Sequence, residues 1–336
     1  MSCLSWNCCG LGNPCVVQEL ANLVRAKDPS AVFLIETWSK SEYLEIILCH
    51  LHFNNKFVVP SNNKGGGLAL FWNNSMNLTI KSFSCHHIDT VINEGQEDAW
   101  RLTGIYGAPK THKRSDMWTF LNRLSHLYQL PWCVIGDFNE IVRLEEMRGP
   151  RPRPDRQMRA FHEALDHSGL IDLRYVRPHF TWCNNCDPPH TTWVRLDRAV
   201  ATTNWLNRFP IARVDHVEVT NSDHRCLWLQ CNPLGSFRYR WKPFRFEEMW
   251  MNDSGCEETI QGIWNQNPRG IAMYKVATKL KDCKKQLGVW SRRCFSSLRR
   301  QLAEKKRQLC KAEVSAMNGG DLGRLKAMRV EVNCLL

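Results

Sequence analysis

The chain has 336 residues, its hydrophobic share of 43% suffices for a sizeable core, and its formal net charge is +12. No stretch approaches the ~20 consecutive apolar residues of a membrane helix, and the N-terminus lacks the charged-then-apolar pattern of a secretory signal. These features argue against a membrane-spanning or secreted protein, so we expect a soluble intracellular one.

Strand-like and helix-like patterns alternate along residues 1–231. Alternating or continuous apolar runs predict strands near residues 2–6, 31–35, 67–72, 77–83, 100–106, 132–136, 179–183, 191–200, 213–219 and 226–230. Amphipathic spacing predicts helices at 15–27, 41–49, 114–128 and 156–168. Many strands interspersed with helices predict an α/β sandwich, in which two packed sheets carry helices on their outer faces.

The character of the chain changes after Cys231. Residues 232–246 are rich in Pro, Gly, aromatic and Arg residues, and we interpret 232–270 as a linker or extended strap. Residues 271–336 form a basic extension in which Lys, Arg, Leu, Gln and Ala recur with helical spacing, interrupted by Asn318-Gly319-Gly320. This pattern predicts helices joined by a glycine turn.

The positive charge lies in the C-terminal part of the chain. Residues 232–336 contain 21 Lys and Arg against 10 Asp and Glu, a net charge of +11, whereas residues 1–231 carry +1. Clustered basic side chains bind polyanions because they displace the counterions of phosphates. The asymmetry therefore predicts a polyanionic partner, and it leaves both a nucleic acid and an anionic membrane surface open.

Sixteen cysteines are spread along the chain rather than packed into a short segment. We expect them to be free thiols in a reducing compartment, because disulfide scaffolds belong to small secreted domains. Cys183 and Cys186 form one C-x-x-C, with His190 after it. A zinc site needs a second pair at suitable spacing, so we prefer a loop with incidental thiols.

Six short polar blocks stand beside strand-like runs: SWNCCGLGNP (5–14), FLIETW (33–38), TGIYGAP (103–109), VIGDFN (134–139), WVRLDRAV (193–200) and NSDHRCLWL (221–229). Strand ends that bring carboxylates and amides to one place make a divalent-metal hydrolytic site. Hard cations bind oxygen ligands, and an attacking water needs an oriented base. The blocks therefore predict a hydrolytic enzyme, with a nuclease as the first choice.

Individual residues in these blocks suit particular roles. Glu36 ends the apolar run AVFLI, where a carboxylate requires a cation or a donor. Asp137 and Asn139 are two apart and share a face, so that the carboxylate can take a proton from water while the amide holds that water or the oxyanion. An ordinary Asx turn is the alternative for this pair. Asn7 precedes a Gly-rich turn, where it can orient a metal-bound water or a phosphate oxygen, or simply cap the turn.

A histidine and its neighbours form the last part of the expected site. Asp223 and His224 precede the strand CLWLQ, and Asp197 lies on a strand expected nearby. Asp197 can fix the tautomer of His224 and raise its pKa, so that a cationic imidazolium stabilises the charge developing on a phosphate. Tyr106 ends RLTGIY, and its phenol can hydrogen-bond the phosphate or the attacking water.

Together, the order and spacing of the six blocks resemble the endonuclease/exonuclease/phosphatase family, which includes apurinic endonucleases, deoxyribonuclease I and inositol-polyphosphate phosphatases. The match covers residues 1 to about 231. WNCCGLGNP at 6–14, GGGLALFW at 65–72 and RFEEMW at 245–250 further resemble the endonuclease that begins the polyprotein of plant LINE-type non-LTR retrotransposons.

The resemblance implies a four-layer sandwich of two mixed sheets with the site at one edge. It implies Glu36 as principal metal ligand, joined by Asn7 and Asp223, with Asp137 as general base and Asn139 as its partner. It further implies Mg²⁺, with Mn²⁺ as the alternative, DNA as substrate, a nuclear location and a nick with a 3′-hydroxyl end. Apurinic endonucleases carry Asn where this chain has Pro109, which disfavours abasic-site activity. The polymerase is absent, so we expect a truncated element product.

Two other functions stay open at this stage. A phosphomonoesterase acting on inositol or lipid phosphates could use the same scaffold, and a catalytically inactive remnant could bind nucleic acid, including RNA, through its basic C-terminal helices. The stretch RGPRPRPDRQMR at 148–159 could lie along a DNA backbone or be a solvated loop. Trp182 and Trp193 could stack on bases, although we expect both in the core.

Overall fold

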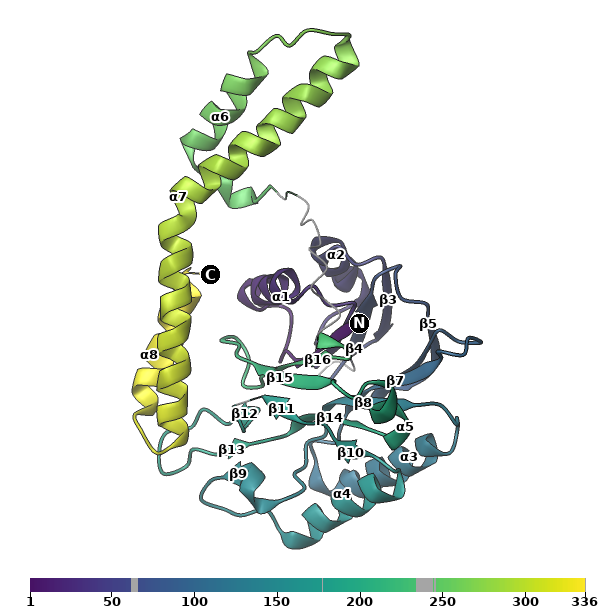
Figure 1. Cartoon of the computed structure of the whole chain (residues 1–336). Coiled ribbons are helices and arrows are strands. Elements are labelled where there is room, and N and C mark those ends of the chain that lie inside the picture. The colour runs from purple at the N-terminus through teal and green to yellow at the C-terminus, as the bar shows by residue number, and fades with distance from the viewer. Residues whose placement is uncertain (62–65, 177, 234–243, 245, 336) are drawn as a thin grey trace.

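The structure, a computed structural model, describes residues 1–61, 66–176, 178–233, 244 and 246–335. Two β-sheets pack face to face in the body of the molecule (Figure 1). Among the described residues, one is seven-stranded, in the order β11 (Tyr175–Val176), β15 (Arg213–Val217), β16 (Cys226–Gln230), β1 (Ser2–Asn7), β2 (Ala31–Ile35), β4 (Leu68–Trp72) and β3 (Asn55–Val59).

The second sheet holds, in order, β10 (Ile171–Asp172), β14 (Asp197–Ala201), β8 (Trp132–Asp137), β7 (Trp100–Tyr106), β6 (His87–Ile92) and β5 (Leu78–Ser84). A small third sheet has the order β12 (Trp182–Cys183), β13 (Trp193–Val194) and β9 (Met147–Arg148). Both large sheets are mixed, because β1 is parallel to β2 and antiparallel to β16, and β8 is parallel to β7 and antiparallel to β14.

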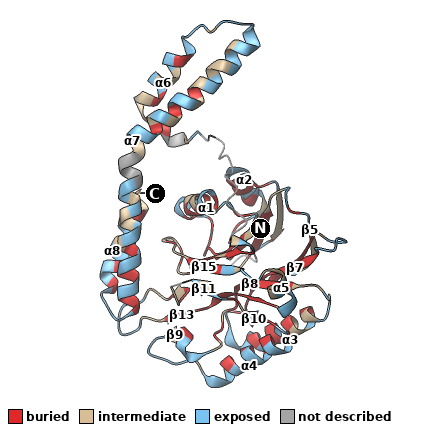
Figure 2. Cartoon of the chain, viewed as in Figure 1, coloured by how far each residue is buried: buried red, intermediate tan, exposed pale blue. Residues whose placement is uncertain are grey.

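Alternation along the strands assigns side chains to two faces of each sheet. In β1, Cys3 lies in the core between the sheets, whereas Leu4 and Trp6 pack on the outer side with residues of α1 (Pro14–Lys27) and α2 (Ser41–Leu51). In β8, Ile135 lies between the sheets and Val134 packs with residues of α3 (Arg114–Ser125) and α4 (Asp155–His167). The expected four-layer α/β sandwich is therefore confirmed, and Figure 2 shows burial concentrated in these layers.

Most expected elements are present, but the long strands predicted at 179–183 and 191–200 are wrong in extent. The structure has the short β12 and β13 and the separate β14 instead. The break arises because the backbone N–H of Arg195 donates to Glu146 O, while those of Leu196 and Asp197 donate to Thr181 Oγ1. The chain thus leaves the small sheet and enters the six-stranded one. Strands β3, β6, β9, β10 and β11 and the helix α5 (Thr203–Arg208) were not predicted.

The C-terminal part is helical, with α6 (Ser254–Trp264), α7 (Ala272–Met317) and α8 (Leu322–Leu335). The predicted glycine turn between α7 and α8 is confirmed, and Gly319 has φ +91° there. The expected strap at 232–270 contains a helix rather than extended chain over 254–264, while its residues 234–243 and 245, and Gly65 of GGGLALFW, lie outside the described residues. No helix in the described ranges is long and apolar enough to cross a membrane.

The extension has two parts that differ in their relation to the body (Figure 1). The last turns of α7 and the start of α8 lie beside the small sheet, and Leu309, Leu325 and Val332 are buried in one apolar cluster with Phe180 and Trp193. The first half of α7 and α6 project beyond the body as a separate helical arm. The end of the extension is therefore part of the folded body.

A buried ion pair stabilises the six-stranded sheet. The Arg101 guanidinium donates to both carboxylate oxygens of Asp89 at 2.8 and 2.9 Å, and to Leu124 O at 2.6 Å. Both side chains are fully buried. Loss of one partner would leave an uncompensated charge in the core.

We predict that Arg101→Ala lowers the free energy of unfolding by about 3–5 kcal/mol, since it leaves Asp89 buried without its cation. Urea unfolding measures this. Arg123→Ala, at an exposed position of α3, is the control and should change stability by less than about 0.5 kcal/mol. Equal losses in the two variants would contradict the role given to the buried pair.

A buried histidine makes stability depend on pH. His216 in β15 stacks on Tyr175 with ring centroids 4.6 Å apart, and its Nδ1 lies 2.7 Å from Pro178 O. Burial, partly offset by this hydrogen bond, lowers the pKa of His216 to about 3. The unfolded chain therefore takes up this proton first as the pH falls. The stabilising contribution is complete above about pH 6.5 and is lost as the pH drops toward 3.

Replacing His216 should make the free energy of unfolding depend less on pH below about pH 6.5. Between pH 6.5 and 5, His216 takes up a proton in the unfolded chain but not in the folded one. This should lower the free energy of unfolding of the wild type by about 2 kcal/mol, at about 1.4 kcal/mol per pH unit. We expect His216→Phe to lose most of that dependence in urea titrations at several pH values. His112→Phe, exposed on the surface, should keep the wild-type slope, and an unchanged slope in His216→Phe would refute the assignment.

Candidate active site

Strand parity brings polar side chains from both sheets into the space between them. Asn7, Tyr106 and Asp137 are the last residues of β1, β7 and β8, and each has the parity of inward-facing neighbours. Asp197 is the first residue of β14 and pairs in register with Asp137. The apolar core therefore ends, at this edge of the sandwich, in amide, phenol and carboxylate groups.

Two glycines allow β7 and β8 to approach closely at this edge. A Cβ on Gly107 would lie 2.1 Å from Phe138 O, and one on Gly136, whose φ is +150°, would lie 2.0 Å from Ile105 O. Asn139 follows in a left-handed conformation with φ 55°. Larger residues at the two glycines would displace the strand ends that carry Tyr106 and Asp137.

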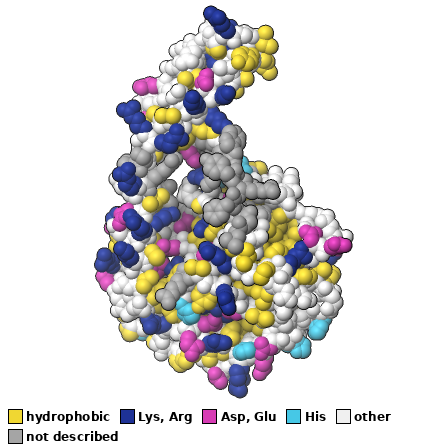
Figure 3. Space-filling view, viewed as in Figure 1, with side chains coloured by type: hydrophobic (Ala, Val, Ile, Leu, Met, Phe, Trp, Pro, Cys, Tyr) yellow, Lys and Arg dark blue, Asp and Glu magenta, His cyan; other side chains and the backbone are white. Residues whose placement is uncertain are grey.

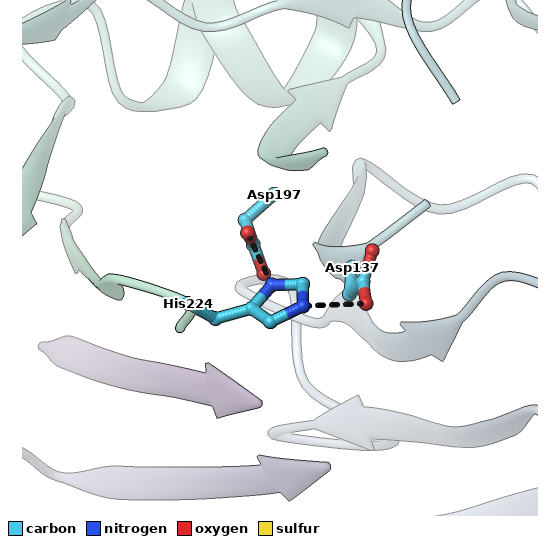
Figure 4. A group of neighbouring side chains, drawn as sticks. All are labelled: Asp137, Asp197 and His224. Atoms are coloured by element: carbon cyan, nitrogen blue, oxygen red, sulfur yellow. Dashed lines mark hydrogen bonds and ion pairs between the residues drawn. The ribbon is translucent and has the colours of Figure 1, made fainter. Parts of the chain in front are cut away.

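His224 lies between two carboxylates (Figure 4). Its Nδ1 is 2.9 Å from Asp197 Oδ2, and its Nε2 is 3.8 Å from Asp137 Oδ2. Asn7 Nδ2 donates to the same Asp137 oxygen at 3.1 Å and lies 3.5 Å from His224 Nε2. All four residues are buried, so one histidine, two carboxylates and an amide form the floor of the site.

The electrostatics of this floor favour a charged imidazole. Burial by itself would lower the pKa of His224, but the carboxylates of Asp197 and Asp137 raise it to about 10. Burial raises the pKa of Asp137 to about 7, against the opposing effect of the His224 charge. His224 is therefore an imidazolium at neutral pH. The imidazole of His224 and the carboxylates of Asp137 and Asp197 also offer ligand atoms within 4.8 Å of one another.

Asn139 orients the Asp137 carboxylate. The Asn139 backbone N–H donates to Asp137 Oδ1 at 2.8 Å, and its side-chain amide donates to Asp137 Oδ2 at 3.1 Å and to Gly107 O at 3.0 Å. The Asx turn that the sequence left as an alternative is thus present, and it fixes the carboxylate at the same time. The structure shows the Asx turn, and the catalytic interpretation of the pair stays a prediction.

Glu36 and Tyr106 form a second, more open group. The Tyr106 hydroxyl donates to Glu36 Oε1, and Glu36 is only partly buried. Burial, followed by the Glu36 carboxylate, holds the pKa of Tyr106 well above its usual value, so the phenol stays protonated. Glu36 directly follows β2, whose last residue pairs with Asn7, and Tyr106 pairs with Asp137. The two groups therefore share one edge of the sandwich.

Asp223 lies beside the floor rather than in it. Its Oδ2 accepts from Trp182 Nε1 at 2.8 Å, and its Oδ1 accepts from Cys9 Sγ at 2.9 Å. Ser222 Oγ donates to Asn7 O at 2.8 Å and accepts from the backbone N–H of His224 at 3.0 Å. These contacts tie the Asp223–His224 segment to the end of β1.

The sequence did not single out Ser222 or Cys9, although both lie in the quoted blocks. Thr181 Oγ1 accepts from the backbone N–H of Asp197 at 2.9 Å and so fixes the carboxylate that faces His224. Trp193 is buried as expected. Trp182 is half-buried: its ring packs against a small apolar cluster, and its Nε1 donates to Asp223.

Two other sequence features lie away from the floor. In the arginine-rich stretch, Arg148 donates to Met317 O and Arg153 pairs with Glu140 at 2.9 Å, so these two side chains make internal contacts. Cys183 is buried and Cys186 is exposed. Within the described ranges, the group of His, Cys, Asp and Glu with metal-ligand geometry consists of Asp137, Asp197 and His224, so the C-x-x-C forms no such group.

Several solved structures share this fold. The endonuclease domain of TRAS1, a telomere-specific non-LTR retrotransposon, has a TM-score of 0.50 and 14% identity over 68% of this chain and 97% of that chain. The 3′ phosphatase NExo from Neisseria, bound to a product DNA hairpin, has a TM-score of 0.54 and 16% identity over 68% and 98%. An AP endonuclease from Archaeoglobus fulgidus has a TM-score of 0.54 and 15% identity over the same shares.

No curated protein matches the chain at a significant level. Residues 4–224 match the model of the endonuclease/exonuclease/phosphatase family. This match spans well over half of the chain and contains every residue of the floor described above. The chain therefore belongs to the endonuclease/exonuclease/phosphatase family.

Proposed function

We propose that this protein is a divalent-metal-dependent phosphodiester hydrolase that nicks DNA, of the retrotransposon-endonuclease type. The observation that carries the proposal is the buried Asp197–His224–Asp137 arrangement, with Asn7 between His224 and Asp137. A floor with a fixed positive charge and a fixed carboxylate suits attack on a phosphate, because negative charge grows on the phosphoryl oxygens.

His224 supplies the positive charge. Its Nδ1–H donates to Asp197, which leaves Nε2–H as the donor that can turn to a phosphoryl oxygen. Asp197 is itself fixed by Thr181, so the ring needs little reorganisation when substrate binds. In this role His224 stabilises the charge of the pentavalent state, and Asp197 keeps it oriented and protonated.

Asp137 is proposed as the base that takes the proton of the attacking water. Two amides, from Asn7 and Asn139, donate to one of its oxygens and hold the carboxylate in one orientation. Asn139 is less buried than Asp137, and its side-chain Oδ1 can accept a hydrogen bond from that water. Tyr106 is protonated and donates to Glu36, and its one hydroxyl hydrogen would turn from Glu36 to the phosphate when substrate binds.

The donor set beside the floor fits a hard cation. Glu36 is a partly exposed carboxylate with one oxygen bound by Tyr106, and Asp223 is a carboxylate in the adjoining loop. Glu36, joined by Asn7 and Asp223, would hold Mg²⁺ or Mn²⁺, since such ions prefer carboxylate and amide oxygens. When bound, the ion polarises the phosphoryl oxygens and stabilises their charge.

DNA is the proposed substrate, and a nuclear location follows from that choice. The solved structure of NExo contains a product DNA hairpin, and the extension of this chain carries a net charge of +11. Figure 3 shows Lys and Arg side chains along the extension, and Lys281, Lys285, Arg292 and Arg293 are exposed on α7. These helices could also bind RNA, since contact with phosphates does not distinguish the two. Pro109 disfavours abasic sites as the preferred target.

A phosphomonoesterase is the second candidate, favoured by the fold shared with a protein described as a 3′ phosphatase. Such an enzyme would release inorganic phosphate and leave a closed DNA circle intact. An inactive nucleic-acid binder is less well supported, because the floor keeps a full set of paired polar groups.

We predict that wild type nicks supercoiled plasmid in Mg²⁺, and that Asp137→Ala and His224→Ala each lower the rate at least about 100-fold. Gel-resolved conversion of supercoiled to open circles measures this, with circular dichroism as the check of folding. Asp116→Ala and His112→Ala, both at exposed positions, should retain activity. Equal nicking by all variants, or no nicking by wild type, would refute the proposal; phosphate release from inositol phosphates without nicking would select the second candidate.

Glu36→Gln tests the metal site separately. We expect the Mg²⁺ concentration for half-maximal nicking to rise at least about tenfold, because the substitution removes a charged oxygen ligand. Glu42→Gln, exposed at the start of α2, is the matched control and should leave the requirement unchanged. Chelation should stop wild-type nicking, and Mg²⁺ or Mn²⁺ should restore it. An unaltered requirement in Glu36→Gln would exclude Glu36 as a ligand.

A further inference from the structure

The segment Glu218–Arg225, here called the site loop, contributes His224 to the active-site floor and carries Asp223 beside it. The loop separates the rest of the floor from the C-terminal helices. Ser222 and Asp223 also contact the end of β1, and the indole of Trp6 donates to His224 O at 3.2 Å. Its outer side faces α7 and α8.

The outer side of the site loop is bound by side chains of the extension. The guanidinium of Arg225 forms an ion pair with Glu313 of α7, and the two side chains are only 8% and 6% exposed. Arg329 of α8 approaches the same carboxylate at 3.3 Å. Asn333 of α8 accepts from Thr220 Oγ1 at 2.6 Å and donates to Asn221 Oδ1 at 3.1 Å.

Arg225 connects the extension to the floor. It directly follows His224, and its backbone N–H donates at 2.7 Å to the carbonyl of Thr181, whose hydroxyl fixes Asp197. A small cavity between the two parts has Asp223, His224 and Arg225 on one wall and Glu313 on another. A shift of the Arg225 side chain would therefore displace both His224 and Thr181, whose hydroxyl supports Asp197.

Two carboxylates, Glu313 and Glu218, lie near the Arg225 guanidinium, and Glu313 is the one that forms the ion pair with it. A buried guanidinium requires a counter-charge, and removal of that charge leaves the site loop to rearrange until Arg225 reaches water. The leucines and alanines that bury α7 and α8 against Phe180 and Trp193 keep Glu313 in place from the other side.

We propose that Glu313 is a positioning residue for the hydrolytic site, and that the C-terminal extension thereby completes the active site through Arg225 and the site loop. The inference rests on the proposed function for its kinetic consequence, because it assumes that His224 and Asp223 serve phosphodiester hydrolysis. Glu313 does not touch the reacting atoms. It acts by fixing the segment that carries them.

The test compares Glu313→Ala, Glu313→Gln, Arg225→Ala and the double variant Arg225→Ala/Glu313→Ala in the full chain. Glu304→Ala is the control, since Glu304 lies on α7 and pairs with Arg307 at an exposed position. We expect Glu313→Ala to lower kcat for plasmid nicking about tenfold or more with KM for DNA unchanged, because misplaced groups lose rate rather than binding. Glu313→Gln, which can still accept from Arg225, should retain more activity.

Two further readouts separate positioning from other roles. The double variant should lose no more activity than Arg225→Ala alone, because both changes remove the same link. Amide hydrogen exchange in peptides covering 218–226 should be faster in Glu313→Ala than in Glu304→Ala, and this measurement does not require activity. Should Glu313→Ala fail to fold, the exchange and kinetic comparisons are made with Glu313→Gln, for which smaller changes in the same direction are expected.

The outcomes distinguish this inference from the proposed function. Wild-type nicking with unchanged kcat and unchanged exchange in the Glu313 variants would overturn the inference alone. A raised KM with unchanged kcat would show that Glu313 affects DNA binding rather than the position of the catalytic groups. Additive losses of activity in the double variant would show that Glu313 does not act through Arg225. Absence of nicking by wild type would instead refute the proposed function, while faster exchange at 218–226 would still support the physical coupling.

Discussion

The packing of the two sheets and the site between them both depend on the positively charged imidazole of His224, which lies between the carboxylates of Asp137 and Asp197. Asp137 and Asp197 are neighbours across paired strands of one sheet, and they would repel each other in a buried place without compensation. His224, which precedes a strand of the other sheet, supplies the compensating charge. The same contact therefore joins the sheets and creates a polarised floor. A group that stabilises the fold in this way is also placed to stabilise charge on a bound phosphate.

The pattern of apolar residues within each strand predicted which site residues lie at the end of that strand. The apolar runs WCVIG and AVFLI placed Asp137 and Glu36 at strand ends, and both lie there. Contacts between side chains of different strands and loops could not be predicted from the pattern within one strand, because they depend on how the sheets assemble. The support of Asp197 by Thr181 and the contacts of Asp223 with Trp182 and Cys9 belong to this second class.

Tertiary partners also explain the errors in the expected elements. Strand β6 reads HIDTVI, and its buried His87 and Asp89 disrupt an apolar pattern; Asp89 is tolerated there because Arg101 neutralises it. The long strand expected at 191–200 divides where Arg195 enters a buried network with Glu146 and Asp172. In the same way, charge counting described the extension as a basic tail, whereas Glu313 and a set of apolar residues make its end part of the body. The arm formed by α6 and the first half of α7 retains the exposed basic character that the composition indicated.

Nitrogen-15 NMR of the imidazole ring measures whether His224 is the cation between Asp137 and Asp197 in the folded protein. The account predicts that both ring nitrogens carry protons at pH 7.5, that the ring loses its proton only near pH 10, and that Asp197→Asn moves this titration to lower pH. A neutral His224 ring at pH 7.5 in the folded wild-type protein would contradict the account.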